Sequence, residues 1–384
     1  MCPQAFGGDI YAGCSMDCWW CFCREMEEEL YNKYYSGWSR NLVRPCDPED
    51  YRRLFDKAFG SDKDYRDWFV SCLRQGLPFN MGSKAETFCR EDVDLGVDSV
   101  VVKVLKIFLE YQVPIIFQTK SHYVGLSRYL DIIKELNCAV VVSVMGGTDT
   151  LNYELEPGSP CASARWYLVK ELLKRKIWTA VRWEPIMPGI NSSREVLESY
   201  AEQVSKSGAH HVSWYNYRTS NARRAQVEFE SRGYNYIKML EKNLDSEWKP
   251  VGDIFLEALS SRGVRQSTPD FVNFPFSNSC QSCCGVDGLF TPYEFTFQHA
   301  CRLILDKGFV NWEDMESVSF KEPKAYERMK AIWNGGRKDY YSLADSPGVV
   351  ILDKDKKGFN VYGKSDAIPS GMKKKKIGFG LNLK

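Results

Sequence analysis

Three cysteines lie close together near the start of the chain, in the stretch Cys14-Ser-Met-Asp-Cys18-Trp-Trp-Cys21. Their C-x3-C-x2-C spacing allows one short loop to wrap an inorganic cluster and to give one sulfur to each of three irons. A [4Fe–4S] cluster held in this way keeps its fourth iron open for another ligand, whereas an electron-transfer cluster would use a fourth cysteine. Structural zinc sites usually have four protein ligands, so zinc or plain reduced thiols are the weaker interpretations. Cys23 is an extra thiol outside this ligand set.

The composition of the 384-residue chain is that of a globular protein with a substantial core, at 44% hydrophobic and 14% aromatic residues. The formal net charge of +1 gives no support for a polyanionic partner, although a local basic face is compatible with it. We expect no membrane span and no signal peptide, because the chain lacks a long apolar run and a charged, apolar leader. The 14 cysteines are irregularly spaced, which favours reduced thiols and metal sites in a cytoplasm.

Strand and helix patterns alternate from about residue 9 to 217, which predicts an α/β fold with a parallel sheet. The expected strands cover 9–12, 77–81, 114–119, 139–144, 177–184 and 210–217. The expected helices cover 51–59, 93–111, 126–136, 162–176 and 193–207, with 47–76 as a helical insertion. In parallel α/β folds the ligands gather at the carboxyl ends of the strands. The residues found there are the cysteine loop, Ser83–Glu86, Lys120, Ser143, Glu184 and Asn216.

The pattern changes after residue 217, and we expect 218–384 to be an extension that covers the open end of the sheet, with a helix in 221–243 and another in 295–305. Two cysteines in the extension, Cys280 and Cys283, have metal-ligand spacing, and Cys284 or Cys301 could supply a third ligand. A second metal site, with His299 or Cys301 as fourth ligand, is one interpretation. A thiol that faces the substrate and a set of reduced thiols are the others. The basic tail 371–384 is expected to be a solvated end rather than a phosphate contact.

The cysteine loop and its aromatic neighbours resemble the radical S-adenosylmethionine (SAM) superfamily, and the order of further motifs resembles the spore photoproduct lyase-like family within it. These motifs are Gly13–Cys21, Phe79–Glu86, Gln118–Lys120, Val142–Val144, Leu155–Gly158, Arg165 and Glu184–Gly189. The resemblance covers about residues 10–215 and implies a partial (β/α)6 barrel. It also implies that Cys14, Cys18 and Cys21 hold a [4Fe–4S] cluster whose open iron binds SAM. The reduced cluster then cleaves SAM to methionine and a 5′-deoxyadenosyl radical, with an external one-electron reductant such as flavodoxin or ferredoxin.

Further positions are implied by the same resemblance. Lys120 and Ser143 match residues that contact polar groups of SAM in that family, and we place Glu86 with them as a cofactor-binding candidate. A lysine can pair with a carboxylate, and a serine can hydrogen-bond to a ribose or a carboxylate. A solvent-facing Lys120 and a loop-bound Ser143 are the alternatives. Arg165 is expected to pair with Glu156 and to brace the fold rather than to bind substrate.

One departure from the family pattern bears on the reaction. The repair lyase has a hydrogen-donating cysteine after its second strand, and the matching residue here is Ser83. A serine O–H bond is too strong to replace that thiol, and Cys89 could substitute only if the loop folds back. Ser83 and Cys89 are therefore the candidate catalytic residues. The departure favours a reaction that recycles SAM or returns hydrogen from 5′-deoxyadenosine.

Rearrangement of an amino-acid adduct on the thymine methyl group meets that requirement, and enzymes of this kind occur in the thymidine hypermodification pathways of DNA viruses. The predicted substrate is thus a modified thymine in DNA or in a nucleotide, acted on in the host cytoplasm. A DNA repair lyase and a non-catalytic Fe–S or zinc protein that binds nucleic acid remain open as alternatives.

Overall fold

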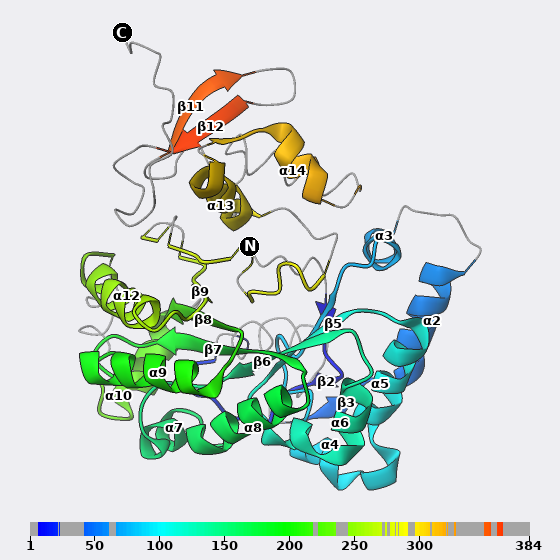
Figure 1. The fold of residues 1–384 in the computed structure, drawn as a ribbon. Helices are drawn as coiled ribbons and strands as arrows, with labels where there is room; N and C mark the ends of the chain where they lie inside the picture. Colours follow the sequence, from blue (N-terminus) through cyan, green and yellow to red (C-terminus); the bar gives the residue numbers. More distant parts are fainter. Residues whose placement is uncertain are drawn as a thin grey trace. The chain divides into compact units, whose positions relative to one another are not determined.

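The protein is described here from a computed structural model. The described residues are 7–21, 23, 42–60, 67–217, 222–235, 245–270, 273–274, 277–280, 282, 284–290, 296–307, 309–319, 321, 326–327, 349–354 and 359–363. The chain divides into two compact units, one formed by residues 4–266 and the other by 267–384 with the first three residues. Figure 1 shows the elements of both.

A seven-stranded sheet organises the first unit, in the order β1-β4-β5-β6-β7-β8-β9. Its strands are β1 (Gly7–Gly8), β4 (Phe79–Met81), β5 (Ile115–Thr119), β6 (Cys138–Ser143), β7 (Trp178–Ile186), β8 (His211–Asn216) and β9 (Gln266–Ser267). Neighbouring strands from β1 to β8 all run parallel. The central strands β5 and β6 are almost entirely buried and rich in β-branched residues, as expected for strands covered on both faces.

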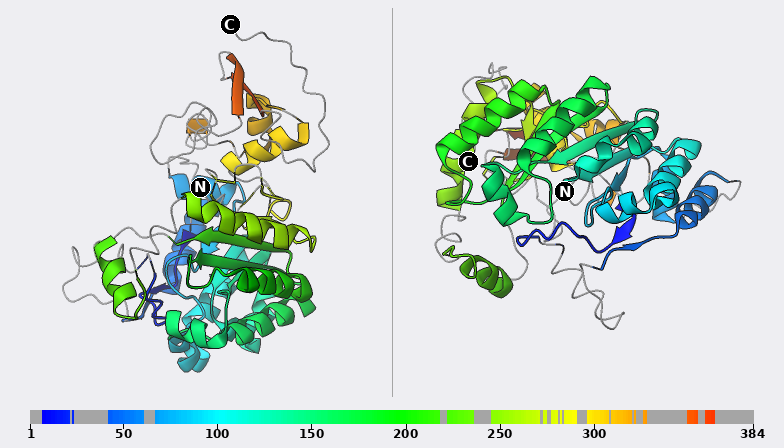
Figure 2. Two further views of the ribbon diagram at one scale, coloured as in Figure 1. Left: turned by 90° about the vertical axis from the view of Figure 1, so that its left-hand side faces the viewer. Right: turned by 90° about the horizontal axis from the view of Figure 1, so that it is seen from below.

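The helices of this unit follow the strands in alternation. They are α2 (Pro48–Phe59), α3 (Trp68–Arg74), α4 (Arg90–Asp94), α5 (Val100–Tyr111), α6 (Ser127–Ile133), α7 (Asp149–Leu155), α8 (Ala162–Lys174), α9 (Arg194–Ser207), α10 (Ala222–Glu230) and α12 (Asp245–Ser260). Helices α8 and α9 lie along one face of the sheet, and the N-terminal segment lies on its other side (Figure 2). On the helix-covered face the fully buried Trp183 of β7 packs against Tyr200 of α9 and Phe255 of α12. The opposite face is therefore the one that is left for a site.

A buried carboxylate, Asp92, joins the segment before the cysteine loop to the helices. It accepts hydrogen bonds from the hydroxyls of Tyr11 at 2.5 Å and Tyr129 at 2.7 Å. It also accepts from the hydroxyl of Ser99 and from the backbone N–H groups of residues 100 and 101 at the start of α5. A fully buried carboxylate is stable only with such a set of donors. Asp92 thereby anchors Tyr11, three residues before the first cysteine of the loop.

The predicted fold class is confirmed, and five of the six predicted strands match the observed ones within two residues at each end. The first strand was wrongly placed at 9–12: the sheet uses Gly7–Gly8, and β2 (Tyr11–Ala12) instead pairs antiparallel with β3 (Arg44–Pro45). The helix predicted over 93–111 is interrupted by a 3-10 turn at Gly96–Asp98, because Ser99 starts a new helix as its N-cap. Strand β7 continues through Pro185, where we expected it to end. Strand β9 and helix α7 were not predicted.

The second unit contains α13 (Phe297–Lys307), α14 (Trp312–Val318) and a three-stranded antiparallel sheet in the order β10-β12-β11. Its strands are β10 (Phe309–Val310), β11 (Val349–Lys354) and β12 (Phe359–Gly363). The unit boundary at 266/267 differs from the domain boundary predicted at 217/218, because α10 and α12 belong to the first unit. That the extension covers the open end of the sheet stays a prediction. The basic tail 371–384 and Cys283 lie outside the described residues.

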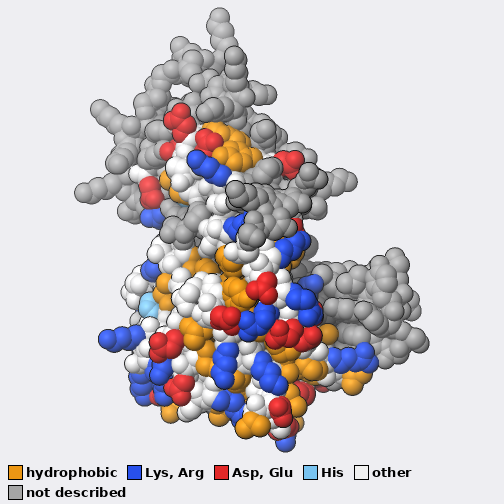
Figure 3. Space-filling view, turned by 90° about the vertical axis from the view of Figure 1, so that its right-hand side faces the viewer, with side chains coloured by type: hydrophobic (Ala, Val, Ile, Leu, Met, Phe, Trp, Pro, Cys, Tyr) orange, Lys and Arg blue, Asp and Glu red, His pale blue; other side chains and the backbone are white. Residues whose placement is uncertain are grey.

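On the face in Figure 3, acidic and basic side chains are interspersed, in keeping with the net charge of +1. Within the described part of the chain, no helix is both long and apolar enough to cross a membrane.

Candidate active site

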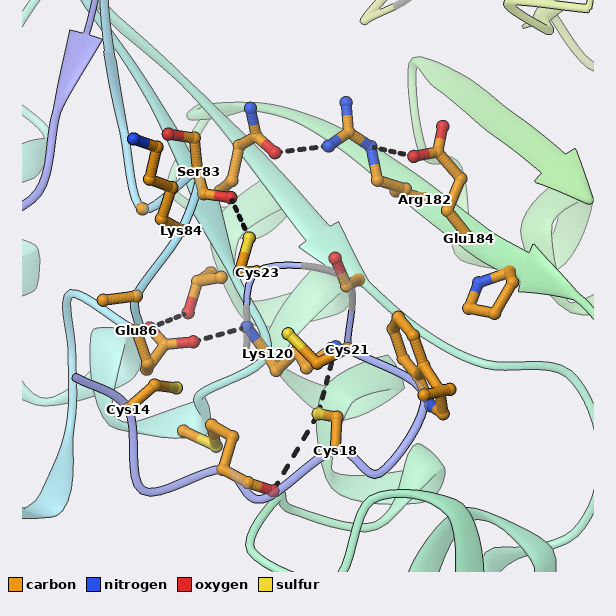
Figure 4. Close-up of a pocket in the computed structure, with 18 of the residues that line it drawn as sticks. Cys14, Cys18, Cys21, Cys23, Ser83, Lys84, Glu86, Lys120, Arg182 and Glu184 are labelled. Atoms are coloured by element: carbon orange, nitrogen blue, oxygen red, sulfur yellow. Dashed lines mark hydrogen bonds and ion pairs between the residues drawn. The ribbon is translucent and has the colours of Figure 1, made fainter. Parts of the chain in front are cut away.

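The three loop cysteines line one cavity of about 460 Å³ in the first unit (Figure 4). The carboxyl ends of β4 to β8 form the rest of its wall. Every strand-end residue predicted for the site lines it: Ser83–Glu86, Lys120, Ser143, Glu184 and Asn216. The topological argument from parallel strands therefore predicted which strand ends share this cavity.

The Glu-Pro-Gly turn at 156–158 holds the backbone of the cysteine loop. The N–H of Gly158 donates to the carbonyl of Met16 at 3.1 Å. A Cβ atom at position 158 would lie 2.2 Å from the carbonyl oxygen of Ser15, so only glycine permits this approach. Within the loop, the N–H of Cys21 donates to the carbonyl of Cys18 at 3.1 Å. The turn and the loop, distant in sequence, thus form one local structure.

The aromatic residues of the loop are covered from two sides. Trp19 packs edge-on against Phe229 of α10 at 4.7 Å and stacks on Tyr234 at 6.3 Å, with Arg232 over its ring at 5.0 Å. Helix α10, which falls in the predicted helical stretch 221–243, therefore lies against the cysteine loop. Such packing shields the loop from water.

Lys120, at the end of β5, joins the cysteine loop to a buried ion network. Its Nζ lies 3.4 Å from Sγ of Cys18, 3.1 Å from Oε1 of Glu156 and 4.2 Å from the ring centroid of Trp20. The second oxygen of Glu156 lies 2.5 Å from Arg165, and both of these side chains are almost fully buried. The pairing of Glu156 with Arg165 that the sequence predicted is thus present. Arg165 also donates to the carbonyl of Ser143 at 3.1 Å.

The pKa values of this network follow from burial and from charge. Burial alone would lower the pKa of Lys120, but the neighbouring Cys18 and Glu156 outweigh it and raise the pKa. Burial would likewise raise the pKa of Glu156, but Arg165 and Lys120 lower it. At neutral pH Lys120 is therefore a cation and Glu156 an anion. The contact of Lys120 with SAM that the resemblance implies stays a prediction, since the ammonium already has partners in the protein.

Glu86 has a clear role in shaping the site. One carboxylate oxygen accepts from the hydroxyl of Thr119 at 2.7 Å and from the N–H of Phe88 at 3.0 Å, and the other accepts from the N–H of Lys120 at 2.8 Å. Glu86 thereby fixes the end of β5 and the starting direction of the Lys120 side chain. Its assignment as a cofactor ligand, like that of Ser143, remains a prediction from the resemblance.

Cys89 does not face the cavity. It is the N-cap residue of α4, is 1% exposed and is absent from the cavity wall, and burial raises the pKa of its thiol. The condition for Cys89 to act as hydrogen donor, a loop folded back into the cavity, is not met. The extra thiol that does line the cavity is Cys23, whose Sγ lies 3.9 Å from the carbonyl oxygen of Ser83. Sequence reasoning set Cys23 aside, although its position two residues after the loop was a usable signal.

The loop thiols fit a cubane cluster better than a single ion. No group of three His, Cys, Asp or Glu side chains among the described residues is placed to hold one metal ion. A cubane does not need such a group, because each cysteine binds a separate iron. Burial raises the pKa of the Cys18 thiol to about 12, with Lys120 acting in the opposite direction and Glu156, Cys21 and Cys14 adding to the rise. A bound metal would offset this cost, since coordination deprotonates a thiol outright.

The second metal site predicted in the extension is not shown. Cys280, Cys284 and Cys301 are buried, and within the described residues they form no metal-holding group with His299. Burial lowers the pKa of His299 to about 4, so its imidazole is neutral at neutral pH. Because Cys283 lies outside the described residues, the four-cysteine site stays a prediction.

Comparison with known proteins gives matches of fold only. No protein-family model and no curated protein sequence matches the chain. Among solved structures, SuiB of Streptococcus suis bound to precursor peptide SuiA aligns with 14% identity and a TM-score of 0.46, over 71% of this chain and 51% of SuiB. Spore photoproduct lyase with a dinucleoside spore photoproduct aligns with 13% identity and a TM-score of 0.45, over 67% of this chain and 74% of the lyase.

A third structure is the radical SAM methyltransferase TsrM of Kitasatospora setae, with 12% identity and a TM-score of 0.37, over 55% of this chain and 36% of TsrM. These neighbours are radical SAM enzymes. Spore photoproduct lyase, whose family the sequence resembles, is thus among the solved structures to which this chain is similar. The chain spans about half the length of the SuiB structures that it matches.

Proposed function

We propose that this chain is a radical SAM enzyme that isomerises a modified thymine, a step in the hypermodification of a DNA base. The observation that carries the proposal is the single cavity that brings Cys14, Cys18 and Cys21 together with Ser83 in place of a thiol. The three cysteines would hold a [4Fe–4S] cluster with an open iron for SAM. When bound, these cofactors supply a 5′-deoxyadenosyl radical that takes a hydrogen atom from the substrate.

The residues of the chain would then position the reactants and exclude water. Lys120 places a positive charge beside Cys18, which favours the thiolate that the cluster requires. Glu156 and Arg165 hold Lys120 in place, and Glu86 fixes its backbone. Trp19 and its partners on α10 close the outer side of the loop. A shielded cavity suits radical chemistry, because it keeps a reactive intermediate from side reactions.

The cavity is also suited to a flat substrate. At about 460 Å³ it lies in the range of small-molecule sites, and Trp20, Tyr215 and Tyr217 are among its lining residues. Aromatic side chains stack on nucleobases with a gain of ~1–3 kcal/mol per base. This supports a thymine-type base as the substrate, either free in a nucleotide or within DNA.

A repair lyase is the second candidate, because the cavity does contain one thiol outside the cluster set. Cys23 lies next to Ser83, the position that matches the hydrogen donor of the lyase family. If its S–H bond gave a hydrogen atom to a substrate carbon radical, the external reductant would have to return an electron and a proton to the resulting thiyl radical. An isomerase that returns hydrogen from 5′-deoxyadenosine needs no such step.

Mass analysis of nucleosides separates these functions. Reduced, cluster-reconstituted protein is incubated anaerobically with SAM and with DNA that carries an amino-acid adduct on the thymine methyl, and the DNA is digested to nucleosides. Isomerisation predicts a product of unchanged mass and altered retention. Release of two thymidines from a spore photoproduct dimer would instead establish a lyase. A protein that turns over neither substrate and makes no 5′-deoxyadenosine would be non-catalytic.

A further inference from the structure

A charged pair on β7 lines the cavity together with the loop cysteines. Arg182 and Glu184 are two residues apart on one strand, so their side chains emerge on the same face of the sheet. Both line the cavity, and Trp183 between them points into the core on the other face. Figure 4 shows both side chains beside the strand, apart from the loop cysteines.

The neighbours of the pair orient it through neutral groups. Arg182 donates through Nη1 to the amide oxygen of Gln118, whose own nitrogen donates to the side chain of Asn80 at 2.8 Å. Glu184 accepts from the hydroxyl of Ser213 at 3.2 Å. These two partners, Gln118 and Ser213, carry no charge.

The contact between the two charges is loose. Nε of Arg182 lies 3.7 Å from Oε2 of Glu184, and the side chains are 16% and 29% exposed. At this separation the contact is an ion pair and not a hydrogen bond. The pair therefore presents a positive and a negative charge side by side to a ligand in the cavity.

Two other charged side chains of the wall, Lys120 and Glu86, are held by partners within the protein. Lys120 is held by Glu156 and Cys18, and Glu86 is held by donors at the end of β5. Lys84 is exposed at the rim. Within the described cavity wall, Arg182 and Glu184 thus form a neighbouring cation and anion that a bound ligand can contact.

We propose that Arg182 binds the carboxylate, and Glu184 the amine, of an amino-acid portion of the substrate. An α-amino acid carries both charges on neighbouring atoms, so one such group can lie across a pair whose charged atoms are 3.7 Å apart. A guanidinium offers the forked donors that match a carboxylate. This inference rests on the proposed function and narrows it, because it selects an adduct that retains both a free carboxylate and a basic amine.

Equilibrium binding to the cluster-reconstituted protein, measured anaerobically by calorimetry, tests the assignment. Four nucleoside probes are compared: thymidine, 5-aminomethyl-2′-deoxyuridine, 5-carboxymethyl-2′-deoxyuridine, and thymidine with glycine joined through its nitrogen to the methyl carbon. N-benzylglycine carries the same charged group without the nucleobase. The wild-type protein is expected to bind the glycine conjugate at least tenfold more tightly than thymidine.

The two substitutions should separate the charges. Arg182→Met should weaken binding of the glycine and carboxymethyl probes by roughly 10- to 100-fold and leave thymidine and the aminomethyl probe within about twofold. Glu184→Gln should weaken the aminomethyl and glycine probes and spare the carboxymethyl one. The SAM dissociation constant of both variants should equal that of the wild type, which also shows that the variants fold.

Two outcomes would overturn the assignment, and a third would overturn only the proposed function. If Arg182→Met weakens SAM binding and spares the nucleosides, the pair belongs to the SAM site. If it weakens every nucleoside equally, the pair is a structural brace. If N-benzylglycine binds as tightly as the glycine conjugate and depends equally on Arg182, the pair does bind an amino acid, but the thymine part of the proposed function fails.

Discussion

Nζ of Lys120 lies 3.4 Å from Sγ of Cys18, so a cation at the end of β5 touches a thiol of the cluster loop. The same ammonium lies 3.1 Å from Glu156, which belongs to the turn that packs on that loop. One lysine thus joins the sheet, the cysteine loop and the turn at 156–158. The sequence resemblance predicted only one role for Lys120, which is contact with SAM.

Substitution of Lys120 should therefore have two separable effects. Lys120→Met removes one partner of the buried Glu156 and should lower the free energy of unfolding by ~1–3 kcal/mol. If Lys120 also pairs with SAM, its loss should weaken SAM binding by a further ~1.5–3 kcal/mol. Chemical denaturation of the protein and SAM titration measure the two separately. An unchanged SAM affinity with reduced stability would make Lys120 a residue of the loop support alone.

Loss of Arg165 should be more damaging than loss of a surface charge. Arg165→Met leaves the buried Glu156 with Lys120 as its remaining cationic partner, and breaking a buried ion pair costs ~3–5 kcal/mol. Arg194→Met is the matched control, because Arg194 forms an exposed pair with Glu198 that should contribute little. Denaturant midpoints compare the two variants. Equal stabilities would contradict a bracing role for Arg165.

Gly158→Ala should disturb the cluster loop, because residue 158 contacts the backbone of this loop although it lies far from it in the sequence. The added methyl group would meet the backbone at 2.2 Å, and overpacking of this kind costs ~1–3 kcal/mol. We expect the variant to retain less iron than the wild type after anaerobic reconstitution. Gly125→Ala is the control, because its added methyl group would meet only Leu168 at an ordinary 3.4 Å. Full iron content in the Gly158 variant would show that the loop does not depend on this contact.

The thiols near Ser83 decide between isomerase and lyase. An isomerase should tolerate Cys23→Ala and Cys89→Ala, with product formation reduced by no more than a few-fold. If Cys23→Ala abolishes product formation while SAM is still cleaved, Cys23 is a hydrogen donor and the lyase interpretation gains its main support. Gain of dimer repair by Ser83→Cys would support the match of Ser83 with the lyase donor.

The parts of this protein that follow local rules were predictable. Strands β5 and β6 are continuous apolar runs, and α9 begins where the sequence predicted a helix over 193–207. Because the strands are parallel, their carboxyl ends meet at one edge of the sheet, and the sequence therefore predicted that Lys120 and Glu184 lie near each other.

Contacts that depend on the folded chain were not predictable. Nothing local to Gly158 shows that it lies on the carbonyl of Met16, and nothing local to Cys89 shows that it faces away from the cavity. Arg182 was missed. It lies two residues before Glu184 in a largely apolar strand, and residues with this spacing share one face of a sheet, so the sequence did indicate that the two charges lie together. The two-residue strand β9 is too short to have a pattern of its own.

The most direct test of the account is iron content together with SAM cleavage in the wild type and in the triple variant Cys14/Cys18/Cys21→Ala. Anaerobically reconstituted wild-type protein should hold about four iron atoms in the loop cluster and, once reduced, should release 5′-deoxyadenosine from SAM. The exposed Cys161, changed to Ala, should leave both values unchanged. The triple variant should lose this iron and all cleavage. Cleavage of SAM at the wild-type rate by the triple variant would contradict the claim that these three cysteines hold the cluster that cleaves SAM.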